Sequence, residues 1–404
     1  MNERLKKLKD KGGIRWIFTN TIPYYAYKYF DPLIGILAKM IFTRKTLKDV
    51  VVIESHNDFD SNGGAFYEYL INNGYNKHYK IVWFLRNRCP KNLPENVVGV
   101  RYSRLSLQRW YYLCIAKYII WGHQVIEPIR KGQISVYTSH GPGGLKNTKG
   151  YEYMPESITY ILTLSKEYSK IQFPSIYGSK RLISLGYPEH DVLYLKENNE
   201  IKKITTKDYK KTIIWMPTFR NNTTGDRKDS SKEQPIGIPL FSSLDEYYMI
   251  DKFLREKDTL LILKLHPMGD LSNLKAESTN NIIIVTGEDA KKKNINVNRL
   301  MLCSDALISD YSSVAYTYLH LDKPIAYVLD DMDDYKLGFV VDDIHELIAG
   351  HEIYCLEDLL NFVNDVVNDD DPYKEKRKQM REYVFDYHDG NSSKRLSDFL
   401  GLSL

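Results

Sequence analysis

Short runs of β-branched and aromatic residues recur along this chain, and helical patterns separate many of them. This alternation is typical of βαβ units, in which a helix connects two parallel strands of one sheet. A first series of expected strands covers residues 49–54, 80–85, 118–121, 134–138 and 158–164. A second series covers residues 212–216, 260–264, 282–285, 306–308 and 324–328. The sequence therefore predicts an α/β protein with two parallel sheets.

A polar, lysine-rich stretch at residues 196–211 separates the two series, and we interpret it as a linker. The length of 404 residues suits two to three domains of ordinary size. We therefore expect an N-terminal segment at residues 1–45, a first α/β domain at 46–200 and a second at 201–404. Two such domains that face each other place a ligand cleft between the carboxyl ends of their strands.

Positive charge is concentrated at the N-terminus. Residues 1–15 hold six basic and two acidic residues, and this excess equals the net charge of the whole chain, +4. Such a small net charge argues against a nucleic-acid partner. Residues 16–42 are rich in aromatic and apolar side chains, but charges and prolines interrupt them before a membrane span is reached. The pattern predicts a helical segment lying on an anionic membrane surface; the alternative is a helix that packs on its own domain.

Cysteine usage and acidic runs give no sign of a metal centre. The four cysteines are widely spaced and include no CxxC pair, which argues against a disulfide framework or a zinc site and favours a reducing compartment. The acidic residues at 330, 331, 333 and 334 lack the spacing of a calcium loop, so we interpret them as a solvated loop. The sequence predicts neither an obligatory metal nor a cofactor.

The loop SHGPGGLK, residues 139–146, follows an expected strand of the first series. Its three glycines allow the backbone to approach a ligand closely. His140 can accept a proton near neutral pH, and Lys146 adds a cation. The alternative interpretation is a tight connection without a ligand.

Two basic motifs follow strands of the second series. Arg220, in WMPTFR, can form a two-pronged contact with a phosphate, although a surface ion pair is the alternative. Lys264 and His266, in KLHP, alternate along the chain and are expected on one side of a strand. A basic pair of this kind suits an anion, whereas a lone histidine before proline would be structural.

A pair of serines, Ser312 and Ser313, follows Asp310 between an expected strand and a helical pattern. Their hydroxyls and the backbone amides of a first helical turn make a suitable anion site. Ordinary helix capping is the alternative, but it needs only one serine.

Taken together, these loops resemble the motifs of the CDP-glycerol glycerophosphotransferase family, which builds teichoic acids and related capsule polymers in Gram-positive bacteria. The resembling segments are SHGPGGLK (139–146), LGYPEHDVLY (185–194), WMPTFRNN (215–222), KLHP (264–267), ISDYSSVAYTYLHLDKPIAYV (308–328) and YHDGNSSKRL (387–396). In one departure, the usual histidine-glycine-threonine-proline-leucine-lysine loop is one residue longer here and lacks the threonine.

The resemblance implies a GT-B-like pair of Rossmann-type domains that face a central cleft, the second of which binds most of the donor. It implies peripheral association of the N-terminal segment with the cytoplasmic face of the membrane. The implied reaction moves a polyol phosphate, glycerol phosphate first, from CDP-glycerol or CDP-ribitol to a hydroxyl of a lipid-linked glycan or polyol-phosphate acceptor and releases CMP.

For this reaction we expect His140 to act as the general base and His266 to contact the phosphates, although the two roles are interchangeable. The donor diphosphate requires a cradle of positive charge and hydrogen-bond donors. The candidates for it are Lys146, Arg220, Lys264, Asp310, Ser312 and Ser313. Two alternatives stay open: a GT-B glycosyltransferase that uses a nucleotide sugar, and a non-catalytic membrane scaffold of a polymer-synthesis complex. The two histidines argue against the scaffold.

Overall fold

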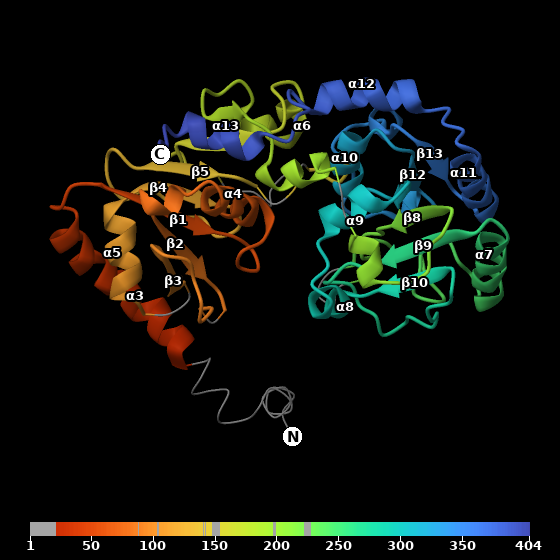
Figure 1. Cartoon of the computed structure of the whole chain (residues 1–404), viewed down its shortest axis with the longest axis horizontal. Coiled ribbons are helices and arrows are strands. Elements are labelled where there is room, and N and C mark those ends of the chain that lie inside the picture. Colours follow the sequence, from red (N-terminus) through yellow and green to blue (C-terminus); the bar gives the residue numbers. More distant parts are fainter. Residues whose placement is uncertain are drawn as a thin grey trace.

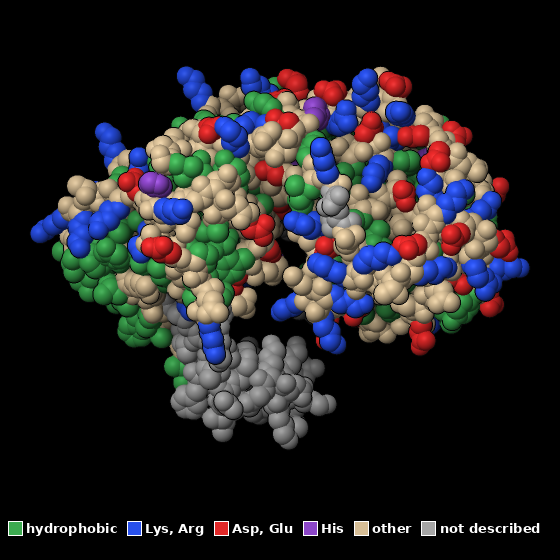
Figure 2. Space-filling model, viewed as in Figure 1, with side chains coloured by type: hydrophobic (Ala, Val, Ile, Leu, Met, Phe, Trp, Pro, Cys, Tyr) green, Lys and Arg blue, Asp and Glu red, His purple; other side chains and the backbone are tan. Residues whose placement is uncertain are grey.

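The computed structural model describes residues 22–87, 89–102, 105–139, 141, 143–147, 154–196, 199–221 and 228–404. Within this part of the chain, two parallel sheets stand side by side, each flanked by helices (Figure 1). Figure 2 shows a hollow between the two halves. The architecture matches the α/β prediction of two sheets.

The first sheet has seven strands in the order β3-β2-β1-β4-β5-β6-β7, and all neighbouring pairs are parallel. Its central strands are almost entirely buried, as expected for a sheet with both faces covered. The strands are β1 (Lys48–Glu54), β2 (Lys80–Leu85), β3 (Val97–Arg101), β4 (Ala116–Trp121), β5 (Ile134–Tyr137), β6 (Tyr160–Thr163) and β7 (Leu182–Ser184).

The second sheet repeats this topology with six parallel strands in the order β10-β9-β8-β11-β12-β13. The strands are β8 (Lys211–Trp215), β9 (Thr259–Lys264), β10 (Ile282–Val285), β11 (Ala306–Ser309), β12 (Ile325–Val328) and β13 (His351–Ile353). In both sheets the strand order reverses once, between β1 and β4 and between β8 and β11. At such a switch point the loops diverge and leave a crevice for a ligand.

All ten expected strands are present, and β3, β7 and β13 are additional. The helices of the first half are α3 (Ile22–Phe42), α4 (Ser61–Asn72), α5 (Leu107–Ile115) and the short α6 (Ser169–Gln172). Those that follow β8 are α7 (Leu244–Glu256), α8 (Gly287–Lys292), α9 (Val297–Cys303), α10 (Val314–Tyr318), α11 (Leu356–Asn368), α12 (Lys374–Val384) and α13 (Ser392–Phe399). Short 3₁₀ turns lie between them, among them η4 (Pro188–Tyr194) and η6 (Leu319–Leu321).

The end of the chain crosses back from the second sheet to the first (Figure 1). Leu396 of α13 and Leu400, the residue directly after this helix, belong to the apolar core that contains Val51 and Ile81 of the first sheet. Asp191 of η4 fixes α13 by accepting the backbone N–H groups of residues 392 and 393 at 2.7 and 2.8 Å. The division at residues 45 and 200 does not anticipate this crossing and stays a prediction.

Helix α3 packs one face on the first domain. Asp31 is buried and pairs with Arg109, and it also accepts the indole N–H of Trp110 at 3.1 Å. Gly35 lies flat on the same indole, where a Cβ would come within 2.5 Å of the ring. No helix in the described part of the chain combines the length and the hydropathy of a membrane span. The basic cluster of residues 1–15 lies outside the described residues.

Candidate active site

Asp310 ties together the two loops at the switch point of the second sheet. It follows β11 directly and is buried. Its Oδ2 accepts the backbone N–H and the hydroxyl of Thr218, both at 2.8 Å, from the loop after β8. Its Oδ1 accepts the N–H of Ser312 at 3.2 Å. Asp310 therefore shapes the site from within and holds both loops in place.

Arg220 is part of the same network. Its side chain is buried, with Nη1 2.9 Å from Asp310 Oδ2 and Nε 2.6 Å from Asp331 Oδ2. Burial opposes its charge, but the two carboxylates raise the pKa of Arg220 above its ordinary value. Tyr311 also donates to Asp331, at 3.0 Å. Because its guanidinium bonds to both carboxylates, the geometry favours a structural role; the phosphate contact stays a prediction.

The interpretation of residues 330–334 as a solvated loop is wrong for the first two. Asp331 is buried, and although burial alone would raise its pKa, Arg220 lowers it below the ordinary value. Asp330 pairs with Lys232 at 2.9 Å, and its side chain is only 5% exposed. The spacing excludes a calcium loop but does not reveal that Asp331 of this turn pairs with Arg220, 111 positions earlier in the chain.

The two serines lie where the second domain meets the first. Ser313 is the N-cap residue of α10, but its side chain makes no capping hydrogen bond. Ser312 Oγ is 3.5 Å from the N–H of Val314, too long for a strong bond. Both serines line a pocket of about 240 Å³ between the domains. Its other lining residues include Ser139, Gly141, Gly144, Lys146, Gln172, Thr218 and His266.

The glycine-rich loop of the first domain docks directly on the serine loop. A Cβ at Gly144 would come within 2.8 Å of the Ser313 nitrogen, so only glycine permits this approach. Backbone hydrogen bonds hold the loop there: Val340 donates to Leu145 and Asn147 donates to Gly338, both at 3.0 Å. The predicted loops of the two domains therefore meet in one site.

His140 itself lies outside the described residues. Its chain neighbours Ser139 and Gly141 both line the pocket between the domains. Ser139 is non-glycine with a positive φ of 60°, and its hydroxyl donates to the carbonyl of Gly141 at 3.1 Å. The backbone on either side of His140 is thus at the site, and the role of this histidine stays a prediction.

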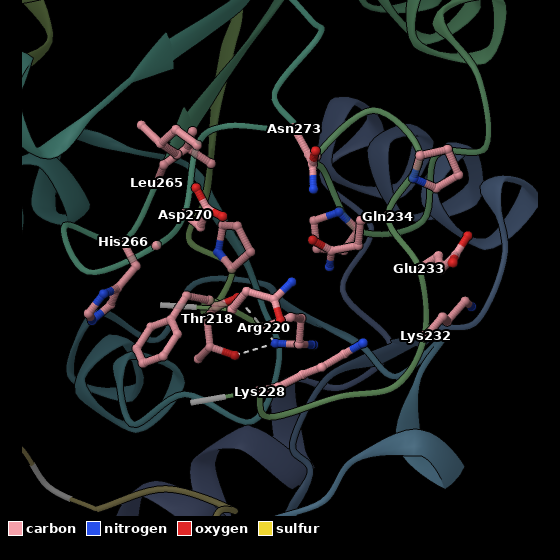
Figure 3. Close-up of a pocket in the computed structure, with 18 of the residues that line it drawn as sticks. Thr218, Arg220, Lys228, Lys232, Glu233, Gln234, Leu265, His266, Asp270 and Asn273 are labelled. Atoms are coloured by element: carbon pink, nitrogen blue, oxygen red, sulfur yellow. Dashed lines mark hydrogen bonds between the residues drawn. The ribbon is translucent and has the colours of Figure 1, made fainter. Parts of the chain in front are cut away.

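His266 stands at the border of two pockets, because it lines both the pocket between the domains and a larger one (Figure 3). Its Nδ1 accepts the backbone N–H of Met268 at 3.1 Å, and its ring packs on Phe219 at 4.9 Å. In the neutral ring the proton therefore sits on Nε2, which makes His266 a hydrogen-bond donor at that atom.

Lys264 and Lys146 lie differently. Lys264 is buried and donates to the carbonyl of Leu265 at 2.8 Å, and burial lowers its pKa. It is not among the lining residues of either pocket, whereas Lys146 lines the pocket between the domains. The structure thus brings Lys146, His266 and the two serines together in one pocket, whereas Lys264 is buried outside both pocket linings.

The larger pocket, of about 400 Å³, lies on the second domain alone (Figure 3). Such a volume suits a small-molecule ligand. Its lining includes Thr218, Arg220, Lys228, Lys232, Gln234, His266, Asp270 and Asn273. The residues from 228 to 239 give no strand or helix pattern, so the sequence carries no signal that would have placed Lys228 or Lys232 at the site.

The model of the family described as CDP-Glycerol:Poly(glycerophosphate) glycerophosphotransferase matches residues 36–401. The chain belongs to this family. The family prediction, drawn from the six motifs, is confirmed, and so is the prediction of a transferase of this type.

Curated relatives and solved structures agree. A teichoic acid poly(glycerol phosphate) polymerase of Bacillus spizizenii is 25% identical over 87% of this chain and 91% of the relative. A teichoic acid glycerol-phosphate primase of Bacillus subtilis is 30% identical over 62% of this chain and 60% of its own length. The solved structure of the wall teichoic acid polymerase TagF covers 95% of this chain and 97% of its own, with 20% identity and a TM-score of 0.69. This likeness confirms the GT-B-like pairing of two α/β domains.

Among the described residues, no group of three or more His, Cys, Asp or Glu side chains is arranged to hold a metal ion. The prediction that the reaction needs no metal stays a prediction.

Proposed function

We propose that this protein transfers a polyol phosphate, glycerol phosphate first, from a CDP-polyol to a polyol-phosphate or lipid-linked glycan acceptor in teichoic acid synthesis and releases CMP. The observation that carries the proposal is the meeting of two family motifs from different domains in one pocket. The glycine loop of the first domain lies against Ser312 and Ser313 of the second, with His266 at the edge.

The donor fits the second domain. The larger pocket suits the nucleoside, and the diphosphate then lies at its border with the smaller pocket, where His266 and the two serines supply hydrogen-bond donors. A donor at Nε2 of His266 stabilises charge on a phosphate oxygen without first having to take up a proton. Lys146 adds positive charge from the first domain. Arg220 and Asp310 stabilise the loops that line the site.

The reaction then proceeds by displacement at phosphorus. The acceptor hydroxyl oxygen attacks the phosphorus that bears the polyol, the bond from that phosphorus to the CMP oxygen breaks, and a phosphodiester forms. The hydroxyl proton passes to His140, our proposed base, which the sequence places between two residues of the pocket wall. Because His266 is a hydrogen-bond donor in its neutral form, we assign the phosphate contact to His266 and the role of base to His140.

The test is CMP release by the purified chain with CDP-glycerol, CDP-ribitol and UDP-sugars as donors. We expect turnover with a CDP-polyol and a loss of about 100-fold or more in His266→Ala, the scale of a transition-state donor. His78→Ala is the matched control, since His78 is exposed and lies before β2. Turnover of UDP-sugars alone would establish a glycosyltransferase, and no turnover with any donor would favour the scaffold.

We also propose that α3 attaches the protein to the cytoplasmic face of the membrane. Its outer face exposes a row of large apolar side chains, each 48–63% exposed, and Figure 2 shows this hydrophobic area at the lower left. The row consists of Ile22, Tyr25, Tyr29, Phe30, Leu33, Ile36, Leu37, Met40 and Ile41. An apolar helix face beside a basic segment suits an anionic bilayer.

Vesicle flotation tests this attachment. We expect Leu37→Glu with Ile41→Glu to reduce binding to anionic vesicles about tenfold or more, because two buried leucine-sized contacts are lost. Met249→Glu is the matched control, an exposed apolar residue on α7 of the other domain. Equal binding by the α3 variant and the control would contradict the proposal.

A further inference from the structure

The switch point of the first sheet carries its own cluster of basic side chains. His56 is the second residue after β1 and His123 the second after β4, and their ring centroids are 4.3 Å apart. Arg86, the first residue after β2, donates from Nη1 to the carbonyl of His56 at 2.8 Å. Three neighbouring strands therefore bring cationic or imidazole groups to the crevice where this fold accepts ligands.

Two carboxylates fix the three loops to one another. Glu54 is fully buried, and its Oε2 accepts the backbone N–H groups of residues 122, 123 and 124 at 3.3, 2.9 and 3.0 Å. Asp58 accepts the N–H groups of Arg86 and Asn87 at 2.7 and 2.8 Å. The last residue of β1 thus holds the loop after β4, and the loop after β1 holds the loop after β2, so the cluster is positioned before any ligand arrives.

The same loop stores backbone strain. Asp58, Phe59 and Ser61 all have positive φ, at 65°, 55° and 51°, although none is glycine. Strain of this kind persists at sites where the surrounding packing enforces it. Here the Phe59 ring packs on Trp83, with centroids 4.5 Å apart, and this contact holds the loop down.

The hydrogen bonds at the two rings define what ligand they suit. Nδ1 of His123 lies 3.0 Å from the amide nitrogen of Gln124, and Nδ1 of His56 lies 3.5 Å from Nη1 of Arg86. The amide nitrogen of Gln124 only donates, so the neutral ring of His123 carries its proton on Nε2. Two imidazole rings and a guanidinium, with an Nε2–H donor on His123, suit an acceptor-rich anion.

The cluster borders the active site. A Cβ at Gly122, next to His123, would come within 3.1 Å of the carbonyl of Ser139, the residue before His140. Asn62 of α4 donates to the carbonyl of Thr138 at 2.8 Å, and this bond ties the loop after β5 to the same end of the sheet. A ligand at His56 and His123 would therefore lie near the backbone of Ser139 in the first domain, whereas the larger pocket lies on the second domain.

We propose that His56, His123 and Arg86 form an anion subsite that binds a phosphate group of the acceptor chain and so positions its terminal hydroxyl for attack. The inference rests on the proposed function, since it names the part of the acceptor that the first domain recognises. An acceptor built of polyol phosphates carries such a group one unit from its reactive end.

A binding experiment tests the subsite without any turnover. The full chain, labelled with ¹⁵N-histidine, is titrated with sn-glycerol 3-phosphate in the absence of nucleotide, and glycerol serves as the neutral probe. We expect the imidazole signals of His56 and His123, assigned with His56→Gln and His123→Gln, to shift with the phosphate probe alone. The signal of His78, at the opposite end of β2, stays unchanged. Shifts that follow glycerol equally, or no shift of either ring, would overturn the proposal.

Kinetics then separate the acceptor from the donor. We expect His56→Gln, His123→Gln and Arg86→Gln each to raise the acceptor KM about tenfold or more, the scale of a lost hydrogen bond to a charged group, with the donor KM changed less than about twofold. His78→Gln is the control. A rise in donor KM instead, or an unchanged acceptor KM, would overturn the subsite. Absence of CDP-polyol turnover in the unaltered chain would refute the proposed function, while the titration would still decide the subsite.

Discussion

The two switch points share one topology but use charge in opposite ways. Between β8 and β11, Arg220 is buried and bonded to two carboxylates, so its charge is balanced within the protein, and His266 and the two serines line the pocket between the domains. Between β1 and β4 the carboxylates bond to backbone N–H groups, and Arg86 stays exposed beside two histidines. The same fold can therefore fix its loops by ion pairs or by hydrogen bonds to the backbone. Where the carboxylates bond to the backbone, the arginine is not neutralised by them and can contact a ligand.

Replacing the arginine of each switch point gives the largest contrast. Arg220→Met leaves Asp310 and Asp331 buried without a counter-charge, and we expect the free energy of unfolding to fall by about 3–5 kcal/mol. Arg86→Met removes an exposed cation and is expected to cost less than about 1 kcal/mol. Urea unfolding of both variants measures the difference. Similar losses of unfolding free energy would contradict the proposed difference between the two arginines.

The docking of the glycine loop joins the two switch points. Gly144→Ala would place a Cβ 2.8 Å from the Ser313 nitrogen and 2.9 Å from the Tyr311 carbonyl, both backbone atoms that cannot swing away. We expect a cost of about 1–3 kcal/mol, seen as a loss of about 10-fold or more in kcat/KM, because the two domains no longer close on the site. Gly178→Ala is the control for backbone strain without a clash, because Gly178 has a positive φ of 78° but its Cβ would meet nothing within 4 Å. Equal activity of the two variants would contradict this docking.

His190 and His320 form a second histidine pair, and it lies deeper in the protein than the partly exposed pair of His56 and His123. His190 of η4 is buried, and its Nδ1 lies 3.0 Å from Nε2 of His320, which stacks on Phe385. Burial lowers the pKa of His190 to about 3 and that of His320 well below its ordinary value, and His388 and Arg381 nearby disfavour the charged form of His320 further.

This pair predicts a loss of stability in mild acid. Below about pH 6.5 the unfolded chain binds a proton that the folded His190 does not, so stability falls as the pH decreases. From pH 6.5 to 5 we expect a fall of about 2 kcal/mol from His190 alone, measured by urea unfolding. The double variant His190→Gln with His320→Gln should flatten this dependence, whereas His78→Gln should not. A slope that survives in the double variant would place its origin elsewhere.

The sequence predicts the interior of each sheet better than its edges. The central strands are continuous runs of apolar residues because both of their faces are covered, and β9 is buried along its whole length. The three strands that sequence patterns did not indicate, β3, β7 and β13, all lie at an edge. They are short or half-buried, and β7 has no fully buried residue, so their pattern resembles that of loops.

Sequence-based prediction reaches a similar limit at the candidate site. Local patterns located the loops, because a polar residue directly after a buried strand lies at the carboxyl edge of a parallel sheet. What they did not reveal is which charges neutralise one another. In the sequence, Arg220 and Lys264 are both cations near the end of a strand. In the structure, Arg220 pairs with Asp331 from a distant turn, whereas Lys264 is buried and bonds to a backbone carbonyl. These partners depend on tertiary packing, as does the contact between Gly144 and Ser313.

The smallest expected effect tests which switch point holds the donor. Ser313→Ala and Ser312→Ala each remove a hydroxyl from the pocket wall, and neither hydroxyl caps α10 strongly, so stability should change little. We expect each to raise the donor KM about two- to tenfold, the worth of one hydrogen bond, and to leave the acceptor KM unchanged. Ser242→Ala, an exposed serine just before α7, is the control. The argument depends on direction more than size: serine variants should act on the donor and His56 or His123 variants on the acceptor. If the serine variants changed the acceptor KM instead, the roles of the two switch points would be exchanged, and the donor pocket would have to be sought at the first sheet.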